Sequence, residues 1–262
     1  MRNKYQRPTR SAQAGQLKTS AMIASLAAEG QRTAPAPFGH ALVKLAAERP
    51  DIVGMSADLS KYTDLHIFAQ AYPDRFYQMG MAEQLLMMSA AGMAREGFMP
   101  FVTTYAVFAS RRAYDFICLA IAEERLNVKI ACALPHEIEQ MVPAIAAHQG
   151  PVYMRLLRGN VPLVLDEYGY KFELGKAKMI RDGRDVLIIS TGFMTMRALE
   201  AAALAAKDKI DVAVLHVPTI KPLDRDSILA AVGKGGRAVI VAENHTVIGG
   251  LGEAVATQIL KA

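Results

Sequence analysis

The stretch GMAEQLLMMSAAGMAREGFMPFVTTYAVFASRRAY, residues 80–114, sets the organisation of the chain. It predicts an apolar helix from Met81 to Arg95, a short strand, and an aromatic-lined turn into a second helix. Glu83 is the only acidic residue between Asp74 and Glu96. A helix that is apolar all round is expected to be buried on all sides. We therefore expect Glu83 at a buried helix end, where the helix dipole offsets part of the cost of burial.

Two aromatic residues follow at the spacing that a helix and a crossing strand need. Tyr105 and Phe108 lie about twenty residues after Glu83 and three residues apart. A buried acid that faces a pair of aromatic rings could hold a flat, nitrogen-containing ring. Each feature alone has an ordinary explanation, because first-turn glutamates are common and aromatic residues after a strand usually belong to the core.

The composition is that of a globular protein. The 262 residues are 52% hydrophobic and 21% charged, with no run of eighteen apolar residues and no secretory signal ahead of the body. The two cysteines, Cys118 and Cys132, lie in apolar segments without metal-ligand spacing, which predicts free thiols in a reducing cytoplasm.

The chain is mildly basic, and its net charge alone excludes no functional class of protein. A formal net charge of +5 comes without the aromatic interleaving or module that nucleic-acid binding needs. Binding of a phosphorylated metabolite is the simpler use of the surplus. Residues 1–33 hold much of it, and this arm either packs on a partner or is a disordered tail.

The pattern of the body predicts an α/β fold in two consecutive domains. Residues 34–165 alternate helices and strands, beginning with a helix from Phe38 to Glu48 and a strand from Asp51 to Leu59. Residues 166–262 repeat the alternation in DVLIISTG, DVAVLHVP and RAVIVAE with three helices between and after them. Each domain is expected to be a mostly parallel sheet flanked by helices.

The ordered set GMAEQ, then PFVTTYAVFASRRAYD, resembles the pyrimidine-binding domain of transketolases and related thiamine-diphosphate enzymes. The resemblance continues before it, in VGMSADLSKYTDL, and after it to the C-terminus, over residues 37–262. It implies that residues 34–165 are a pyrimidine-binding domain and residues 166–262 a transketolase C-terminal domain. The sequence IGGLG, 248–252, fits the turn of that second domain and lacks the spacing of a dinucleotide site.

The resemblance also implies a cofactor site for thiamine diphosphate. Glu83 would be the catalytic residue that hydrogen-bonds the pyrimidine nitrogen, protonated or sharing a proton in dry surroundings. Tyr105 and Phe108 would stack on that ring. Asp58 and Leu59, from the ADL motif, would border the thiazolium ring, although spacing alone favours Asp58 as a turn or helix cap.

Two basic residues are implied as substrate ligands. Arg158 matches the position of an arginine that grips the sugar phosphate, and Lys61 follows the ADL motif where the family places polar groups. A solvated edge arginine and a solvated loop lysine are the ordinary alternatives. His245 is left open between a supporting role near the site and an interface role.

The chain lacks the GDG pattern with a downstream Asn that holds Mg²⁺ and the diphosphate in this family. The resemblance therefore implies the smaller, C-terminal subunit of a split transketolase. An N-terminal subunit would supply the diphosphate and metal site, in a two-plus-two heterotetramer. No metal ligand is expected in this chain.

A second departure lies between Pro135 and His136. The family has a few tens of residues there, including a glycine-rich loop with a catalytic histidine that His136 does not match. Either the chain carries a genuine deletion or the sequence omits a segment. The intact motifs on both sides favour an omission.

The implied function is transfer of a two-carbon ketol unit from a phosphorylated ketose to an aldose. One alternative is the β subunit of a 2-oxo acid dehydrogenase, which is built from the same two domains. FASRRAYD and the ADL motif are closer to the sugar-phosphate enzymes. The other alternative is a non-catalytic paralogue that lost its active-site loop.

Overall fold

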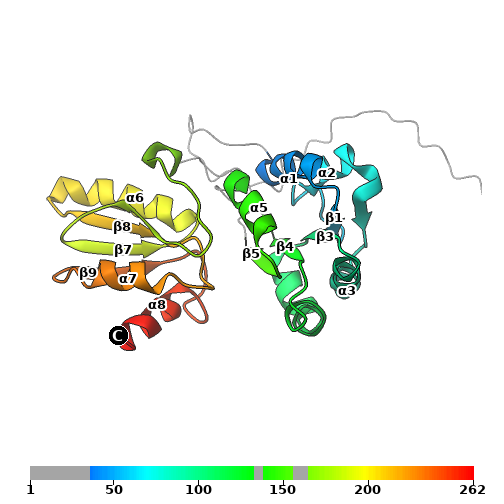
Figure 1. Ribbon diagram of the computed structural model, residues 1–262. Helices are drawn as coiled ribbons and strands as arrows, with labels where there is room; N and C mark the ends of the chain where they lie inside the picture. Colours follow the sequence, from blue (N-terminus) through cyan, green and yellow to red (C-terminus); the bar gives the residue numbers. More distant parts are fainter. Residues whose placement is uncertain (1–35, 133–137, 156–164) are drawn as a thin grey trace, which may run out of the picture.

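The structure, a computed structural model, describes residues 36–132, 138–155 and 165–262. The predicted arm of residues 1–33, the junction between Pro135 and His136, and Arg158 lie outside these ranges. The described chain builds two sheets, with five strands before residue 156 and four after residue 177. The predicted α/β fold of two helix-flanked, mostly parallel sheets is confirmed (Figure 1).

The first sheet is parallel throughout, in the order β2-β1-β3-β4-β5. Its three central strands are short and fully buried, as expected for strands covered on both faces. The strands of the sheet are β1 (Ile52–Ser56), β2 (Phe76–Gln78), β3 (Met99–Thr103), β4 (Lys129–Cys132) and β5 (Val152–Arg155).

Helices cover both faces of this sheet (Figure 1). One face carries α1 (Pro37–Glu48), α2 (Leu65–Ala71) and α5 (Ile138–Ala147). The other carries α3 (Glu83–Arg95) and a helical segment made of η2 (Phe108–Arg112), α4 (Tyr114–Phe116) and η3 (Ile117–Ala122). The turn η1 (Pro73–Arg75) joins α2 to β2.

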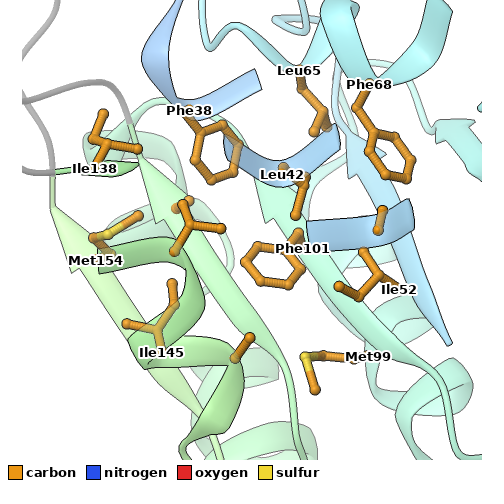
Figure 2. Close-up of a cluster of buried hydrophobic side chains, with 14 residues drawn as sticks. Phe38, Leu42, Ile52, Leu65, Phe68, Met99, Phe101, Ile138, Ile145 and Met154 are labelled. Carbon is orange, nitrogen blue, oxygen red and sulfur yellow. The ribbon is translucent and has the colours of Figure 1, made fainter. Parts of the chain in front are cut away.

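The central strand β3 connects the two halves of the core. Phe101 points into the cluster with Phe38 and Leu42 of α1 (Figure 2), and Val102 points to the opposite face with Leu86 of α3. All five residues of β3 are buried, because alternate side chains of a strand covered on both faces meet a different layer of helices.

The second sheet has the order β6-β8-β7-β9. Its three predicted strands are parallel: β7 (Val186–Ser190), β8 (Val212–His216) and β9 (Ala238–Ala242). A fourth strand, β6 (Lys178–Arg181), pairs antiparallel with β8 and was not predicted, because its short, half-buried run KMIR has no apolar pattern.

Helices flank this sheet as well. One face packs on α6 (Phe193–Ala205), and the other packs on α7 (Arg225–Val232) and α8 (Leu251–Leu260). Short turns η4 (Leu165–Tyr168) and η5 (Ala206–Asp208) complete the described elements. In the part of the chain that the structure describes, no helix combines the length and apolarity that crossing a membrane requires.

The expectation that α3 is buried on all sides is wrong for the single chain. Its inner face, with Leu86 and Ala90, packs into the core. Its outer face leaves Leu85 52% and Met88 46% exposed. The helix is apolar on a face that this chain alone does not cover.

One glycine controls how closely α1 approaches α2. A Cβ on Gly39 would lie 2.3 Å from the backbone oxygen of Asp64 and 2.8 Å from Cβ of Ile67. Neither atom is the end of a flexible side chain, so the clash has no easy relief.

We expect Gly39→Ala to lower the free energy of unfolding by about 2 kcal/mol, because overpacking forces backbone shifts. Gly92→Ala, on α3, is the matched control, since a Cβ added there would meet nothing within 4 Å. That control should be neutral or stabilising, because alanine favours a helix over glycine. Chemical denaturation measures both, and equal effects of the two substitutions would contradict the close-approach argument.

Candidate functional site

The carboxyl ends of β2, β1 and β3 lie at one edge of the first sheet, because neighbouring parallel strands share their direction. Hydrogen bonds tie the loops there together. The amide of Ala57 donates to the carbonyl of Thr103 at 3.3 Å, and the amide of Gly80 donates to the carbonyl of Ala57 at 2.8 Å. The segments that carry Asp58 and Glu83 therefore start from the same edge.

Glu83 is the first residue of α3, and it is 1% exposed. The predicted buried acid at a helix start is therefore found. Thr104, which follows β3 directly, places its hydroxyl 3.5 Å from Oε1 of Glu83. The end of β3 thus comes within reach of the start of α3.

The aromatic pair is held together next to this acid. The rings of Tyr105 and Phe108 stack with centroids 5.9 Å apart and planes 26° from parallel. Arg112 joins the pair to the acid, because its Cζ lies 4.4 Å from the centre of the Phe108 ring and its Nη1 contacts Glu83. The structure thus brings together the three residues in which the sequence predicted a ring-binding site.

Arg112 is the residue that sequence reasoning missed. Its Nη1 donates to both carboxylate oxygens of Glu83, at 2.9 Å to Oε2 and 3.1 Å to Oε1. A signal existed, because Phe108 and Arg112 are four residues apart, a spacing that puts two side chains on one helical face. Thr104 was missed too, and the sequence offers no signal for it beyond its place after a buried strand.

The remaining predicted site residues lie in the loop that follows β1. Asp58 is exposed two residues past the strand, and Leu59 is half-buried, with its carbonyl accepting from Thr63 Oγ1 at 3.1 Å. Lys61 is exposed. Arg158 lies outside the described residues. His245 is exposed in the loop between β9 and α8.

The arrangement fits the pyrimidine half of thiamine diphosphate. Glu83 would hydrogen-bond to a ring nitrogen, and Tyr105 and Phe108 would stack on the face of the ring. Binding such a ring needs a buried acid beside aromatic side chains. The described residues contain no group of three or more His, Cys, Asp or Glu side chains placed to hold a metal ion.

A second buried acid lies close to this edge. Asp64 precedes α2 in a left-handed conformation with φ of 57°, and it is 8% exposed. Its Oδ2 has no hydrogen-bond partner among the described residues. Burial raises the pKa of the Asp64 carboxyl to about 7.

The sequence matches two transketolase family models. The model for the transketolase pyrimidine binding domain matches residues 32–215, and the model for the transketolase C-terminal domain matches residues 175–262. The two matches overlap over residues 175–215.

Similar proteins and structures point the same way. A putative uncharacterized transketolase family protein, y4mN of Sinorhizobium fredii, is 64% identical, with 99% of this chain and 86% of that protein covered. The 6-deoxy-6-sulfo-D-fructose transketolase subunit SqwH of a Clostridium species is 36% identical over 82% of this chain and 77% of its own. A solved structure described as a split gene transketolase, inactive beta4 tetramer, superposes with a TM-score of 0.80 and 38% identity, covering 86% of this chain and 83% of its own.

The alignment with y4mN also shows a difference in length. It runs over 296 positions against the 262 residues of this chain, so at least 34 of its positions have no residue here. A few tens of residues is the length that the resemblance predicts to be lacking.

The buried Asp64 carboxyl makes a testable contribution to stability. Its folded-state pKa, about 7, is above the usual aspartate value of 3.8, so its contribution to stability is fully present below pH 4 and is lost as the pH rises through 7. Asn tolerates the left-handed backbone and carries no charge. Asp64→Asn should therefore be more stable than the parent at pH 8, by up to about 4 kcal/mol, and this gain should shrink toward pH 4.

Denaturant unfolding at several pH values measures the effect, with Asp74→Asn, an exposed position, as control. Parallel stability curves for the parent and Asp64→Asn would contradict the assignment of a buried, ionising carboxyl.

Proposed function

Because the chain belongs to the transketolase family, we propose that it is the smaller subunit of a two-chain transketolase. It moves a two-carbon ketol unit from a phosphorylated ketose to an aldose. The observation that carries the proposal is the buried Glu83 at the start of α3, beside the stacked pair Tyr105 and Phe108. An acid that is 1% exposed is costly to bury, and buried acids of this kind are common at functional sites.

Thiamine diphosphate, when bound, supplies the carbon centre that attacks the ketose carbonyl and carries the two-carbon unit. The residues of this chain position that chemistry. Glu83 holds a proton at the pyrimidine nitrogen. Tyr105 and Phe108 fix the plane of the ring and exclude water from it, and Asp58 and Leu59 border the thiazolium side.

The partner is an N-terminal transketolase subunit that holds the diphosphate and Mg²⁺. The names of two similar proteins, a transketolase subunit and a split gene transketolase, support a two-chain arrangement. The uncovered apolar face supports it from the structure. That face, called here the α3 face, consists of exposed side chains on and beside α3, namely Met81, Leu85, Met88 and Leu119. An exposed apolar patch of this kind is typical of a subunit interface, and we propose a two-plus-two heterotetramer.

The substrate is an anionic sugar, and Lys61 and Arg158 bind its phosphate. Lys61 supports this because it is exposed in the loop that follows the ADL motif, near the edge that carries Glu83.

Cys118 and Cys132 form no disulfide, which supports a reducing cytoplasm.

A non-catalytic role is the alternative that one observation favours. At least 34 positions of the y4mN alignment have no counterpart in this chain. If they fall between Pro135 and His136, the loop with the catalytic histidine is lost, and the chain keeps only its subunit surfaces. Thiamine-diphosphate binding by the two-chain complex separates the readings, since a non-catalytic paralogue would bind none. Turnover of a 2-oxo acid in place of a ketose would favour the 2-oxo acid dehydrogenase alternative.

Glu83→Gln should lower ketol transfer by about 100-fold or more, because the amide no longer holds a proton at the ring nitrogen. The circular dichroism of the chain should be unchanged. Glu96→Gln, at the exposed end of the same helix, is the control and should retain activity. Ketol transfer from a phosphorylated ketose, assayed with the partner chain, measures the effect. Parent-level transfer by Glu83→Gln would exclude Glu83 as the catalytic residue.

Leu85→Glu should prevent assembly through the α3 face, because burying an unpaired carboxylate in an interface is costly. Sedimentation velocity should show a smaller species than the parent forms with its partner. Leu204→Glu makes the same change on the exposed surface of α6 and should assemble like the parent. An unchanged assembly for Leu85→Glu would place the subunit interface elsewhere.

A further inference from the structure

The contact between Glu83 and Arg112 has a role that the transketolase proposal does not include. We propose that Arg112 is a positioning residue for the cofactor: it pairs with the Glu83 carboxylate and aims it at the ring site. This inference rests on the proposed function, since the ring it serves is the pyrimidine. It adds a residue from the helical segment after the aromatic pair to a site predicted from α3 and the aromatic pair alone.

Arg112 compensates the charge of the buried Glu83 carboxylate. Glu83 is 1% exposed, and a lone carboxylate buried that deeply is strongly disfavoured. Arg112 is the only cation that pairs with it among the described residues. The side chain of Arg112 is 43% exposed, so its guanidinium keeps part of its hydration while it compensates the buried charge. The pair therefore avoids much of the cost of burying two ions.

The contacts of Arg112 also orient the Glu83 carboxylate. Nη1 of Arg112 lies 2.9 Å from Oε2 and 3.1 Å from Oε1, so a single nitrogen contacts both oxygens and holds the carboxylate in position. The guanidinium is itself held, because its Cζ lies 4.4 Å from the centre of the Phe108 ring. Phe108 thus orients Arg112, and Arg112 orients Glu83. The aromatic side chain that takes the cofactor ring is thereby coupled to the acid that binds it.

Arg112 also influences which group donates the hydrogen bond between Glu83 and the ring nitrogen. An ionised carboxylate only accepts hydrogen bonds, whereas a protonated one also donates. Both oxygens of Glu83 accept from Nη1 of Arg112, so the ring nitrogen is the expected donor of the hydrogen bond between the ring and the carboxylate.

Binding of thiamine diphosphate to the two-chain complex, measured by equilibrium dialysis, tests the proposal. Arg112→Met should bind the cofactor at least tenfold more weakly than the parent. Arg111→Met is the matched control, since Arg111 is exposed on the same segment and makes no ion pair with Glu83 in the described structure. It should bind like the parent. Arg112→Lys keeps the charge and should recover part of the loss.

Two further measurements separate positioning from a general structural role. A cofactor analogue with carbon in place of the ring nitrogen should bind equally to the parent and to Arg112→Met. In a Glu83→Gln background, Arg112→Met should have no further effect on cofactor affinity. Loss of affinity for both cofactor and analogue would overturn the proposal in favour of a structural role. Unchanged or tighter cofactor binding by Arg112→Met would also overturn it.

The unfolding of the chain alone makes the test independent of the proposed function. Arg112→Met should lower the denaturant midpoint of the parent and leave that of Glu83→Gln unchanged. If the parent complex binds no cofactor, the proposed function fails while this coupling still stands. If the coupling is absent, the inference on Arg112 fails while the transketolase assignment stands.

Discussion

The burial of one carboxylate at the start of a helix is the constraint on which the site depends. Arg112, at the end of the segment that begins with Phe108, pairs with Glu83 there and compensates its charge. That contact requires α3 and the segment from Phe108 to Arg112 to pack against the same face of the first sheet. The apolar residues of both elements supply that packing, so the core and the site are built by the same arrangement.

A second buried charged side chain in the first domain also has polar partners. Lys129, at the start of β4, is fully buried and donates from Nζ to the carbonyls of His148 and Gly150, both at 2.7 Å. Burial lowers its pKa to about 8. Its partners are neutral carbonyls from the chain that follows α5, so it ties two elements together at the edge opposite the site. Asp64 differs, because its Oδ2 lacks such a partner among the described residues.

The carboxyl edge of the parallel sheet brings the functional segments together. Because β1 and β3 are neighbours, the loop with Asp58 and the residues Thr104 and Tyr105 begin side by side. Helix α3 is apolar on the side that faces the core and also on the side that faces solvent, as the exposure of Leu85 and Met88 shows. Under the proposed function, one chain therefore presents half of a cofactor site next to a surface suited to another subunit.

The sequence by itself determined the fold class, a helix with Glu83 in its first turn and the pairing of Tyr105 with Phe108. Short-range periodicity encodes such features, and the elements α7 and α8 lie where their apolar patterns predicted. The strand β6 escaped prediction because its pairing with β8 is antiparallel and its own pattern is weak. Only the tertiary structure decided that Arg112 neutralises Glu83 and that Asp64 is buried. Both outcomes depend on which distant side chains share one volume, and a one-dimensional pattern of polar and apolar residues does not contain that information.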